Sequence, residues 1–508
     1  MWTKEGLVEL VHEKLRDYKF ILVSNREPYM HRYAGGGIDC VQPASGLTLA
    51  LDPIMRACGG SWIAHGSGDA DWEVVDRQDR VAVPPEDPCY TLRRIRLNSR
   101  QEERYYYGLS NQALWPLCHI VFTRPVFRPE DWQTYREVNQ VFARAILEEA
   151  GDAPTFVFIQ DFHFALLPRM LKERNANLVI AQFWHIPWPN PEVLRGFPWK
   201  AELLDGLLGN DLLGFHLNFH CQNFLDTADR MLEARVDREK NEIVRAGKAT
   251  SVRAFPISID FQRHAVEAES AITEQHMETW RRSLDLHDEL VGIGIDRIDY
   301  TKGICERLRA LDRFLTKYPQ YRERLVFVQV AVPSRSRIPE YRMLEKEVEQ
   351  LVKEINRKYR RWPGRSWRPI VLLKRSYPQD RLTALHRLAH FCMVSSLHDG
   401  MNLVAKEYVA SRVDEDGVLI LSDFAGASRE LTDAIVVNPF SEEESVEAIR
   451  QALEAPEEER RKRMRKMRAV VAENNVYRWA GKIISALLKF EFSASDENNA
   501  SLSASEPQ

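Results

Sequence analysis

Short runs of apolar and β-branched residues recur along the chain and alternate with longer stretches of helical periodicity. The runs are apolar at successive positions, which is typical of parallel strands that are buried on both faces. They occupy residues 20–25, 156–161, 178–186 and 211–216, and then residues 291–296, 324–331, 370–374, 391–396, 417–423 and 434–439. We therefore expect an α/β chain with two open parallel sheets.

The same pattern suggests where the domains begin and end. A charged helical connector separates a strand-like segment, 254–260, from the run that begins at residue 291. We expect an N-terminal Rossmann-like domain over 1–260, opened by a helix within 1–18, and a second Rossmann-like domain over 261–475, with a cleft between them. A helix over 476–492 is expected to pack back on the N-terminal domain, and the polar segment 493–508 to be a disordered tail.

Composition and charge narrow the classes of function. The 508 residues are 44% hydrophobic and 28% charged, as in folded soluble proteins, and the net charge of -4 gives no sign of a nucleic-acid binder. The seven cysteines form no C-x-x-C pair, and the N-terminus lacks the apolar core of a signal peptide. We expect a cytoplasmic protein with neither a membrane nor a nucleic-acid partner; assembly into a homo-oligomer stays open.

Candidate chemistry comes from the polar residues that follow the apolar runs. In open parallel sheets, ligands bind at the carboxyl ends of the strands. The residues at such positions are Arg26, Asp161, His163, His185, Arg297, Asp299, Lys302, Arg335, Arg337, Asp399 and Asn402. The two histidines have no metal-ligand spacing, so neither a metal nor another cofactor is expected.

The segment 296–303, DRIDYTKG, places Lys302 where the next helix begins. A cation there opposes the helix macrodipole by roughly 0.3 to 1 kcal/mol, so a bound anion would explain its position. Together with Arg297, the turn could hold a diphosphate through side chains and helix amides. Alternatively, these two cations pair with Asp296 and Asp299 on the surface.

The turn 398–403 forms a second helix start at a strand end. Asn402 is the expected N-cap, which would leave backbone amides of the turn facing the cleft. Glu407 follows one turn into the helix, where it could accept hydrogen bonds from the vicinal hydroxyls of a ribose. Alternatively, Glu407 is an ordinary solvated helix residue.

Glycine, arginine and aromatic residues add weaker candidates. Gly46 stands at the head of a helical pattern and is compatible with a backbone approach to phosphate, or with a plain turn. The guanidinium groups of Arg26 and Arg335 suit bidentate phosphate recognition. Tyr106 and Trp115 could pack on a sugar ring, or could belong to the core.

Ten motifs, in order along the chain, resemble the trehalose-6-phosphate synthase family of retaining GT-B glycosyltransferases. They are SNR (24–26), GGSW (59–62), SNQALWP (110–116), QDFH (160–163), HIPWPNPE (185–192), DLLGFH (211–216), RIDYTKG (297–303), PSR (333–335), DGMNLVAKE (399–407) and SDFAGASREL (422–431). The likeness spans about residues 20 to 488. It implies that glucose is transferred from a nucleoside-diphosphate glucose to glucose 6-phosphate, with UDP-glucose as the expected donor. Such a reaction belongs to trehalose biosynthesis and osmoprotection.

The resemblance also implies roles for individual residues. The donor would be bound by Gly46, His185, Arg297, Lys302, Asp399, Gly400, Met401, Asn402, Leu403 and Glu407. The sugar-phosphate acceptor would be bound by Arg26, Tyr106, Trp115, Asp161 and Arg335. Residues near the reacting atoms would be Arg297, Lys302, His185 and Asp161. A covalent intermediate would require a carboxylate beside the anomeric carbon, and because the position of Asp161 implies acceptor binding, a same-face mechanism assisted by the donor phosphate is favoured.

Several positions depart from the family pattern. They are Ser45, His65, Phe162 and His398, and the segment between Arg26 and Gly46 is longer than the short loop expected there. The sequence REPY (26–29) also resembles glucosylglycerol-phosphate synthases, which implies glycerol 3-phosphate as an alternative acceptor. A further alternative is a noncatalytic sugar-phosphate sensor on the same fold.

Overall fold

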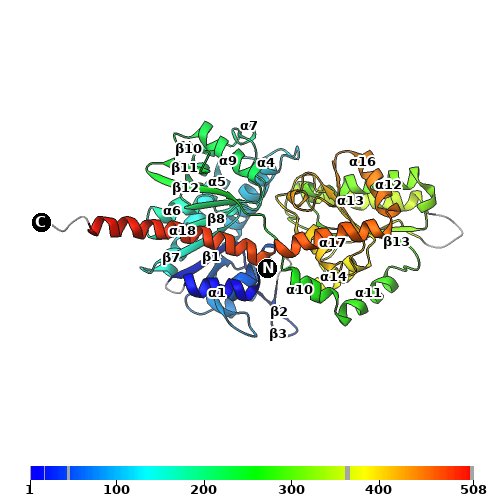
Figure 1. The fold of residues 1–508 in the computed structure, drawn as a ribbon, viewed down its shortest axis with the longest axis horizontal. Helices are drawn as coiled ribbons and strands as arrows, with labels where there is room; N and C mark the ends of the chain where they lie inside the picture. The colour runs from blue at the N-terminus through cyan, green and yellow to red at the C-terminus, as the bar shows by residue number, and fades with distance from the viewer. Residues whose placement is uncertain (1, 16–17, 43–45, 361–366, 504–508) are drawn as a thin grey trace. The chain divides into compact units, whose positions relative to one another are not determined.

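The chain divides into two compact units in the computed structural model, which describes residues 2–15, 18–42, 46–360 and 367–503. The N-terminal unit comprises Trp2–Ile257 together with the segment from Tyr477 onward, and the C-terminal unit comprises Ser258–Val476. Each unit is built on its own sheet, so each has its own core (Figure 1).

The N-terminal unit contains a ten-stranded sheet of order β10-β11-β12-β9-β8-β7-β1-β4-β6-β5. Its parallel strands are β1 (Lys19–Arg26), β4 (Ser61–His65), β6 (Tyr90–Ile95), β7 (Thr155–Gln160), β8 (Leu178–Phe183), β9 (Leu212–Phe215) and β12 (Lys248–Ala254). Antiparallel strands β5 (Arg80–Val83), β10 (Arg235–Asp237) and β11 (Glu242–Arg245) complete the edges. Counted along the chain, the parallel strands lie in the order 3-2-1-4-5-6-7, which is doubly wound.

Helices surround this sheet. They are α1 (Lys4–Lys14), α2 (Gly46–Cys58), α3 (Ser99–Gln101), α4 (Trp115–His119), α5 (Pro129–Ala150), α6 (Leu167–Lys172), α7 (Pro191–Leu194), α8 (Lys200–Leu207), α9 (Asn218–Met231) and α18 (Val476–Ser503), with short 3-10 turns η1 (Asp71–Glu73) and η3 (Phe162–Phe164). Between α3 and α4, η2 (Glu102–Leu114) is a π-helix. Trp115 N–H closes it by donating to the carbonyl of Ser110, five residues back.

Helix α18 lies beside strands of the N-terminal sheet (Figure 1). The Trp479 ring packs on Phe158 of β7 and Phe183 of β8, with ring centroids 5.9 and 5.2 Å away. Its Nε1 donates to the carbonyl of Phe255 at 3.2 Å. The helix continues to Ser503, into the segment for which composition predicts a disordered tail, and residues 504–508 lie outside the described part of the chain.

The C-terminal unit contains a fully parallel six-stranded sheet of order β15-β14-β13-β16-β17-β18. The strands are β13 (Leu290–Arg297), β14 (Leu325–Val332), β15 (Ile370–Leu373), β16 (Phe391–Val394), β17 (Val418–Ser422) and β18 (Ile435–Val437). Counted along the chain, their order is 3-2-1-4-5-6, the Rossmann arrangement. The helices are α10 (Phe261–Ala268), α11 (Ala271–Ser283), α12 (Ile304–Lys317), α13 (Pro339–Lys358), α14 (Gln379–Leu388), α15 (Leu403–Ser411), α16 (Glu442–Glu454) and α17 (Glu457–Glu473), with 3-10 turns η4 (Tyr300–Lys302), η5 (Pro319–Tyr321) and η6 (Gly426–Arg429).

All ten apolar runs form strands, so this prediction is confirmed. The strand-like interpretation of 254–260 is wrong, because the strand there, β12, ends at Ala254. Pro256 follows directly, and proline has no N–H to donate to a neighbouring strand. The segment between Arg26 and Gly46 contains a hairpin that the sequence did not reveal, formed by β2 (Met30–Ala34) and β3 (Gly37–Val41).

Candidate functional site

The strand order of each sheet marks where a ligand can approach. In a doubly wound sheet, the connections leave in opposite directions from two adjacent central strands, and a crevice forms at their carboxyl ends. In the C-terminal unit these strands are β13 and β16, and in the N-terminal unit they are β1 and β7. Candidate residues stand at these ends in both units: Arg297 and Asp399 in one, Arg26 and Asp161 in the other.

Asp299 is the centre of the polar cluster after β13. Its Oδ2 accepts from Arg335 Nη1 at 3.0 Å and from the Tyr341 hydroxyl at 3.3 Å. Burial alone would raise the pKa of the Asp299 carboxyl, but Arg335, Arg297 and Lys302 hold it below its ordinary value. A charged, buried carboxylate therefore stabilises three cations at one strand end.

Lys302 reaches from this turn to the next strand end. Its Nζ lies 2.5 Å from Asp399 Oδ2, and Asp399 also accepts from the side chains of Ser396 and Asn402 at 3.3 and 3.2 Å. Asp296 is occupied elsewhere, in a buried ion pair with Arg307 at 2.7 Å. Lys302 therefore joins the two halves of the C-terminal crevice.

The turn 399–403 is fixed by its backbone as well as by its side chains. Asn402 caps α15 and accepts from Ala405 N–H at 3.2 Å, which confirms the predicted N-cap. The carbonyl of Met401 accepts from Ala427 N–H at 2.8 Å, and a Cβ on Gly426 would lie only 2.1 Å from the carbonyl oxygen of Gly400. Leu403 begins the helix.

Helix α12 offers a second set of backbone donors beside this turn. It begins at Ile304 after Gly303, which has φ +63° and supplies no side-chain cap. A Cβ at Gly303 would lie 2.2 Å from the carbonyl of Ser395, so only glycine allows the close approach of the two turns. The first amides of α12 therefore have no capping side chain to satisfy them.

Glu407 lies on α15 one turn beyond Leu403 and is half-buried. Burial, with a smaller contribution from the nearby Glu267 carboxylate on α10, raises its pKa from 4.5 to about 7. Glu407 is thus not an ordinary solvated helix residue. A half-buried carboxylate favours a partner that donates hydrogen bonds.

In the N-terminal unit, Arg26 ends β1 and is exposed. Its Nη2 donates to the Tyr106 hydroxyl at 3.3 Å, and the Tyr106 ring stacks on His163 with centroids 5.9 Å apart. Tyr106 lies in the π-helix η2, whose wide turns are held partly by side chains: Asn111 Nδ2 donates to the carbonyl of Tyr106 at 2.7 Å. The ends of β1 and β7 thereby meet through two rings.

Asp161 follows β7 with φ +73°, an uncommon conformation for a residue with a side chain. Its Oδ1 accepts from the backbone N–H groups of Phe162 and His185 at 2.9 and 3.1 Å. The His185 ring lies against Gln160, with Nε2 2.9 Å from Gln160 Oε1, so Nε2 carries the proton. Burial lowers the pKa of His185 to about 3, and the ring is neutral.

Other residues singled out from the sequence are not part of these polar clusters. The Trp115 ring is buried and packs on His119 and Phe162, with centroids 4.1 and 5.9 Å away, as the core-packing alternative predicts. Gly46 is the first residue of α2, as the helical pattern indicates, while the neighbouring Ser45 lies outside the described residues. His65 ends β4 and contacts the carbonyl of Ile95 at 3.1 Å.

The hairpin after Arg26 is held by a buried charged network. Arg94 Nε donates to Glu27 Oε2 at 2.8 Å, and Arg94 Nη2 lies 3.0 Å from Asp71 Oδ1. Asp71 in turn accepts from the backbone N–H of His31 in β2 at 2.7 Å. Burial and the neighbouring Asp71 raise the pKa of Glu27 to about 8. The longer segment is therefore an ordered part of the N-terminal unit.

The structure adds residues that sequence reasoning did not assign to the site. Asp299 and His163 appeared only as strand-end residues, and Gln160 was not singled out. Gln160 directly precedes Asp161, so its place as the last residue of β7 was a usable signal. Across the described ranges, no group of three or more His, Cys, Asp or Glu side chains is arranged to hold a metal ion. No helix there is long and apolar enough to cross a membrane.

Comparison with known proteins gives consistent matches. The model of Glycosyltransferase family 20 matches residues 18–489. Trehalose-6-phosphate synthase of Mycolicibacterium vanbaalenii is 38% identical, over 93% of this chain and 96% of that protein. The corresponding protein of Mycobacterium leprae is also 38% identical, over 93% and 95% of the two chains.

Solved structures match equally far along the chain. A UDP-forming α,α-trehalose-phosphate synthase from Burkholderia xenovorans, in complex with glucose-6-phosphate, has a TM-score of 0.82 and 30% identity over 92% of this chain and 99% of its own. An E. coli protein bound with UDP-2-fluoro glucose has the same TM-score and identity, over 92% and 99%. The fold is the GT-B architecture of these synthases.

Proposed function

The chain belongs to glycosyltransferase family 20, and we propose that it moves glucose from UDP-glucose to glucose 6-phosphate with retention, giving α,α-trehalose 6-phosphate. The observation that carries the proposal is the clustering of candidate residues at the switch point of each sheet. The relatives and the Burkholderia xenovorans structure, which carry the same activity in their names, support it, as does the E. coli structure bound with UDP-2-fluoro glucose.

The C-terminal unit is proposed to bind the donor. Arg297 and Lys302 would hold the diphosphate, with the uncapped amides of α12 as further donors. The Asp399–Leu403 turn would bind the glucose hydroxyls, and Glu407 would accept hydrogen bonds from the ribose. Lys302 already lies 2.5 Å from Asp399, which supports a role at the point where diphosphate and glucose join.

The N-terminal unit is proposed to contribute the acceptor residues. Arg26, exposed beside Tyr106, suits the phosphate of glucose 6-phosphate, and Asp161 suits a sugar hydroxyl. Trp115 would support Asp161 through its contact with Phe162 rather than touch the sugar. Neutral His185, with Nε2 given to Gln160, would offer Nδ1 as an acceptor to a donor hydroxyl. Arg335 of the C-terminal unit, now bound to Asp299, would also reach the acceptor phosphate.

A same-face transfer fits these groups best. The donor phosphate would take the proton of the incoming hydroxyl while Arg297 and Lys302 stabilise the charge that develops on the leaving diphosphate. A covalent intermediate would need a carboxylate poised at the anomeric carbon. Asp161 uses Oδ1 to receive two backbone N–H groups, an arrangement that orients the carboxylate rather than frees it for attack.

One assay tests the proposal. UDP-, ADP- and GDP-glucose are each incubated with glucose 6-phosphate or glycerol 3-phosphate, and products are identified by mass spectrometry. UDP-glucose with glucose 6-phosphate is expected to give a nonreducing disaccharide phosphate at the highest kcat/KM. Higher kcat/KM with glycerol 3-phosphate would contradict the proposed acceptor, and no product with any pair would contradict the transferase itself.

We also propose a cytoplasmic location. All seven cysteines are unpaired, and two of them, Cys40 and Cys89, are exposed. Disulfides form readily in oxidising compartments, so a free-thiol chain fits a reducing one.

A further inference from the structure

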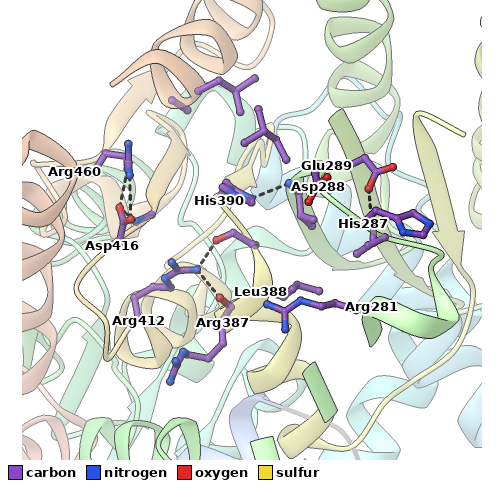
Figure 2. A pocket seen from close by; sticks show the side chains of 17 residues that line it. Arg281, His287, Asp288, Glu289, Arg387, Leu388, His390, Arg412, Asp416 and Arg460 are labelled. Atoms are coloured by element: carbon purple, nitrogen blue, oxygen red, sulfur yellow. Dashed lines mark hydrogen bonds and ion pairs between the residues drawn. The ribbon is translucent and has the colours of Figure 1, made fainter. Parts of the chain in front are cut away.

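Figure 2 shows a cavity of the C-terminal unit, which has a volume of about 450 Å³. It lies at the opposite end of the strands from the proposed donor residues. It is lined by Leu290, the first residue of β13, and by His390 and Gly417, which directly precede β16 and β17. Because these strands are parallel, their first residues all lie at one end of the strands and their last residues at the other end. A ligand here would not compete with one bound beside Arg297.

The cavity wall is rich in cationic side chains. Arg281 comes from α11, Arg412 from the C-terminal end of α15, and Arg460 from α17 (Figure 2). Arg412 and Arg460 are anchored by Asp414 and Asp416, at 2.9 and 2.7 Å, and so are held in fixed positions. Arg281 is 43% exposed, and its recorded partner is Glu278 on its own helix.

His390 presents a defined hydrogen-bond donor to this cavity. Its Nδ1 accepts from the backbone N–H of Val291 at 2.9 Å, so the neutral ring carries its proton on Nε2 (Figure 2). Among the described residues no partner is recorded for Nε2. His390 is exposed at the cavity wall. Partial desolvation, together with the charges of Arg412 and Arg460, lowers the pKa of its ring, while Asp416 and the hydrogen bond from the Val291 N–H act in the opposite sense.

We propose that this cavity binds a small phosphorylated molecule bearing hydroxyl groups, with its phosphate between His390 Nε2–H and the Arg281 guanidinium. Arginine and imidazole N–H groups are the donors that phosphate oxygens require. Asp288 and Glu289, on the same wall, are carboxylates that accept from hydroxyls. The volume is in the range of small-molecule sites and exceeds what phosphate alone would fill.

The test follows the ring of His390 by NMR on the whole chain labelled at histidine Cε1, with the signal assigned from His390→Gln. Inorganic phosphate is titrated against sodium chloride at matched ionic strength, with UDP present to occupy the donor site. Phosphate is expected to shift the His390 signal saturably and to raise the pKa of the ring, because an adjacent anion stabilises imidazolium. A response equal to that of chloride would overturn the proposal.

Matched variants locate the phosphate. Arg281→Ala should raise the dissociation constant read from His390 about tenfold, since a charge-assisted hydrogen bond is lost. Arg282→Ala removes the same charge from the next position of α11, where the side chain is exposed and does not line the cavity, and should leave it unchanged. If both variants raised the dissociation constant equally, phosphate would be responding to the overall charge rather than to Arg281, and the proposed site would be overturned. Sorbitol 6-phosphate should bind more tightly than phosphate, and equal affinity would overturn the role of the carboxylates.

Discussion

At the scale of single residues, the candidate site is organised by carboxylates with little exposure to solvent, which hold cations in place. Asp299 binds Arg335, and Asp399 binds Lys302, each within hydrogen-bond distance. Removing one partner of such an ion pair destabilises the protein, because the other partner is left as an unpaired charge with little access to solvent. Cations fixed before a ligand arrives need little reorganisation to bind a diphosphate.

Replacing Lys302 tests the proposed role in leaving-group stabilisation. Lys302→Ala is expected to lower kcat for glucosyl transfer by about 10²- to 10³-fold, as for loss of one preorganised donor. Initial rates with UDP-glucose and glucose 6-phosphate measure it. Lys317→Ala, at the far end of α12, removes an equal charge paired with Glu443 and should leave kcat unchanged. Unaltered turnover in Lys302→Ala would remove the argument for the phosphate clasp.

The raised pKa of Glu407 predicts a pH dependence of donor binding. Below about pH 7 the side chain is neutral, and above it the carboxylate is a stronger acceptor for ribose hydroxyls. The KM for the donor should therefore fall about three- to tenfold between pH 6 and pH 8. Glu407→Gln, which cannot titrate, should give a flat profile; the same slope in the variant would assign the effect to another group.

The raised pKa of Glu407 has the opposite effect on the stability of the chain without ligand, which should fall as the pH rises. A raised carboxyl pKa favours the folded state at low pH, and this contribution is lost as pH rises through about 7. At pH 8, Glu407→Gln should be roughly 1 to 3 kcal/mol more stable than the parent chain, and the difference should shrink toward pH 4.5. Urea unfolding at both pH values measures it, and a less stable variant at pH 8 would contradict the burial cost.

At the scale of elements, turns and helices bring these residues to the strand ends. The π-helix η2 carries Tyr106 to Arg26, and Gly303 lets the turn before α12 approach β16. Helix α18 joins the N-terminal unit although the whole C-terminal unit precedes it in the chain. Its contribution to that unit is open to a direct measurement.

Truncating Trp479 tests how much α18 stabilises the N-terminal unit. The side chain is 2% exposed and packs on two strands. Trp479→Ala should lower the free energy of unfolding of this unit by about 3 to 5 kcal/mol. Trp479→Phe, which keeps a ring but loses the bond to Phe255, should lose about 1 kcal/mol. Chemical denaturation followed by circular dichroism measures both, and a loss below that of the Phe variant would contradict the packing role.

At the scale of the whole molecule, the proposed reaction assigns roles to residues of both units. Most donor candidates belong to the C-terminal unit, and most acceptor candidates belong to the N-terminal unit. Gly46 and His185 are donor candidates of the N-terminal unit, and Arg335 is an acceptor candidate of the C-terminal unit. If residues of both units bind the same acceptor, replacing an arginine of either unit should raise the KM for that acceptor.

Arg26→Ala and Arg335→Lys are therefore expected to raise the KM for glucose 6-phosphate about tenfold or more, while the KM for UDP-glucose stays unchanged. Lysine at 335 keeps a charge for Asp299 but loses the planar fork that binds phosphate. Lys353→Ala, exposed on α13, serves as a charge control. An increase confined to the donor KM would contradict the acceptor role of either residue.

The sequence by itself determined the local order of the chain. Successive apolar residues identified ten parallel strands, and Asn402 marked the start of α15, because burial on both faces and helix capping act over a few neighbours. The resemblance in ten motifs identified the family. Strands β4 and β12, although they lie inside the N-terminal sheet, were missed, since their composition alone does not separate them from loops.

Only the tertiary structure decided which charges meet. Lys302 and Asp399 are 97 residues apart in the chain, and Asp299 and Arg335 are 36 apart, so no local pattern could pair them. The strand order placed these residues together at the carboxyl ends of the strands. Folding also brought Glu407 into a half-buried position near Glu267, which raised the pKa of Glu407. Side-chain chemistry is written in the sequence, but partner and solvent exposure depend on contacts between distant segments.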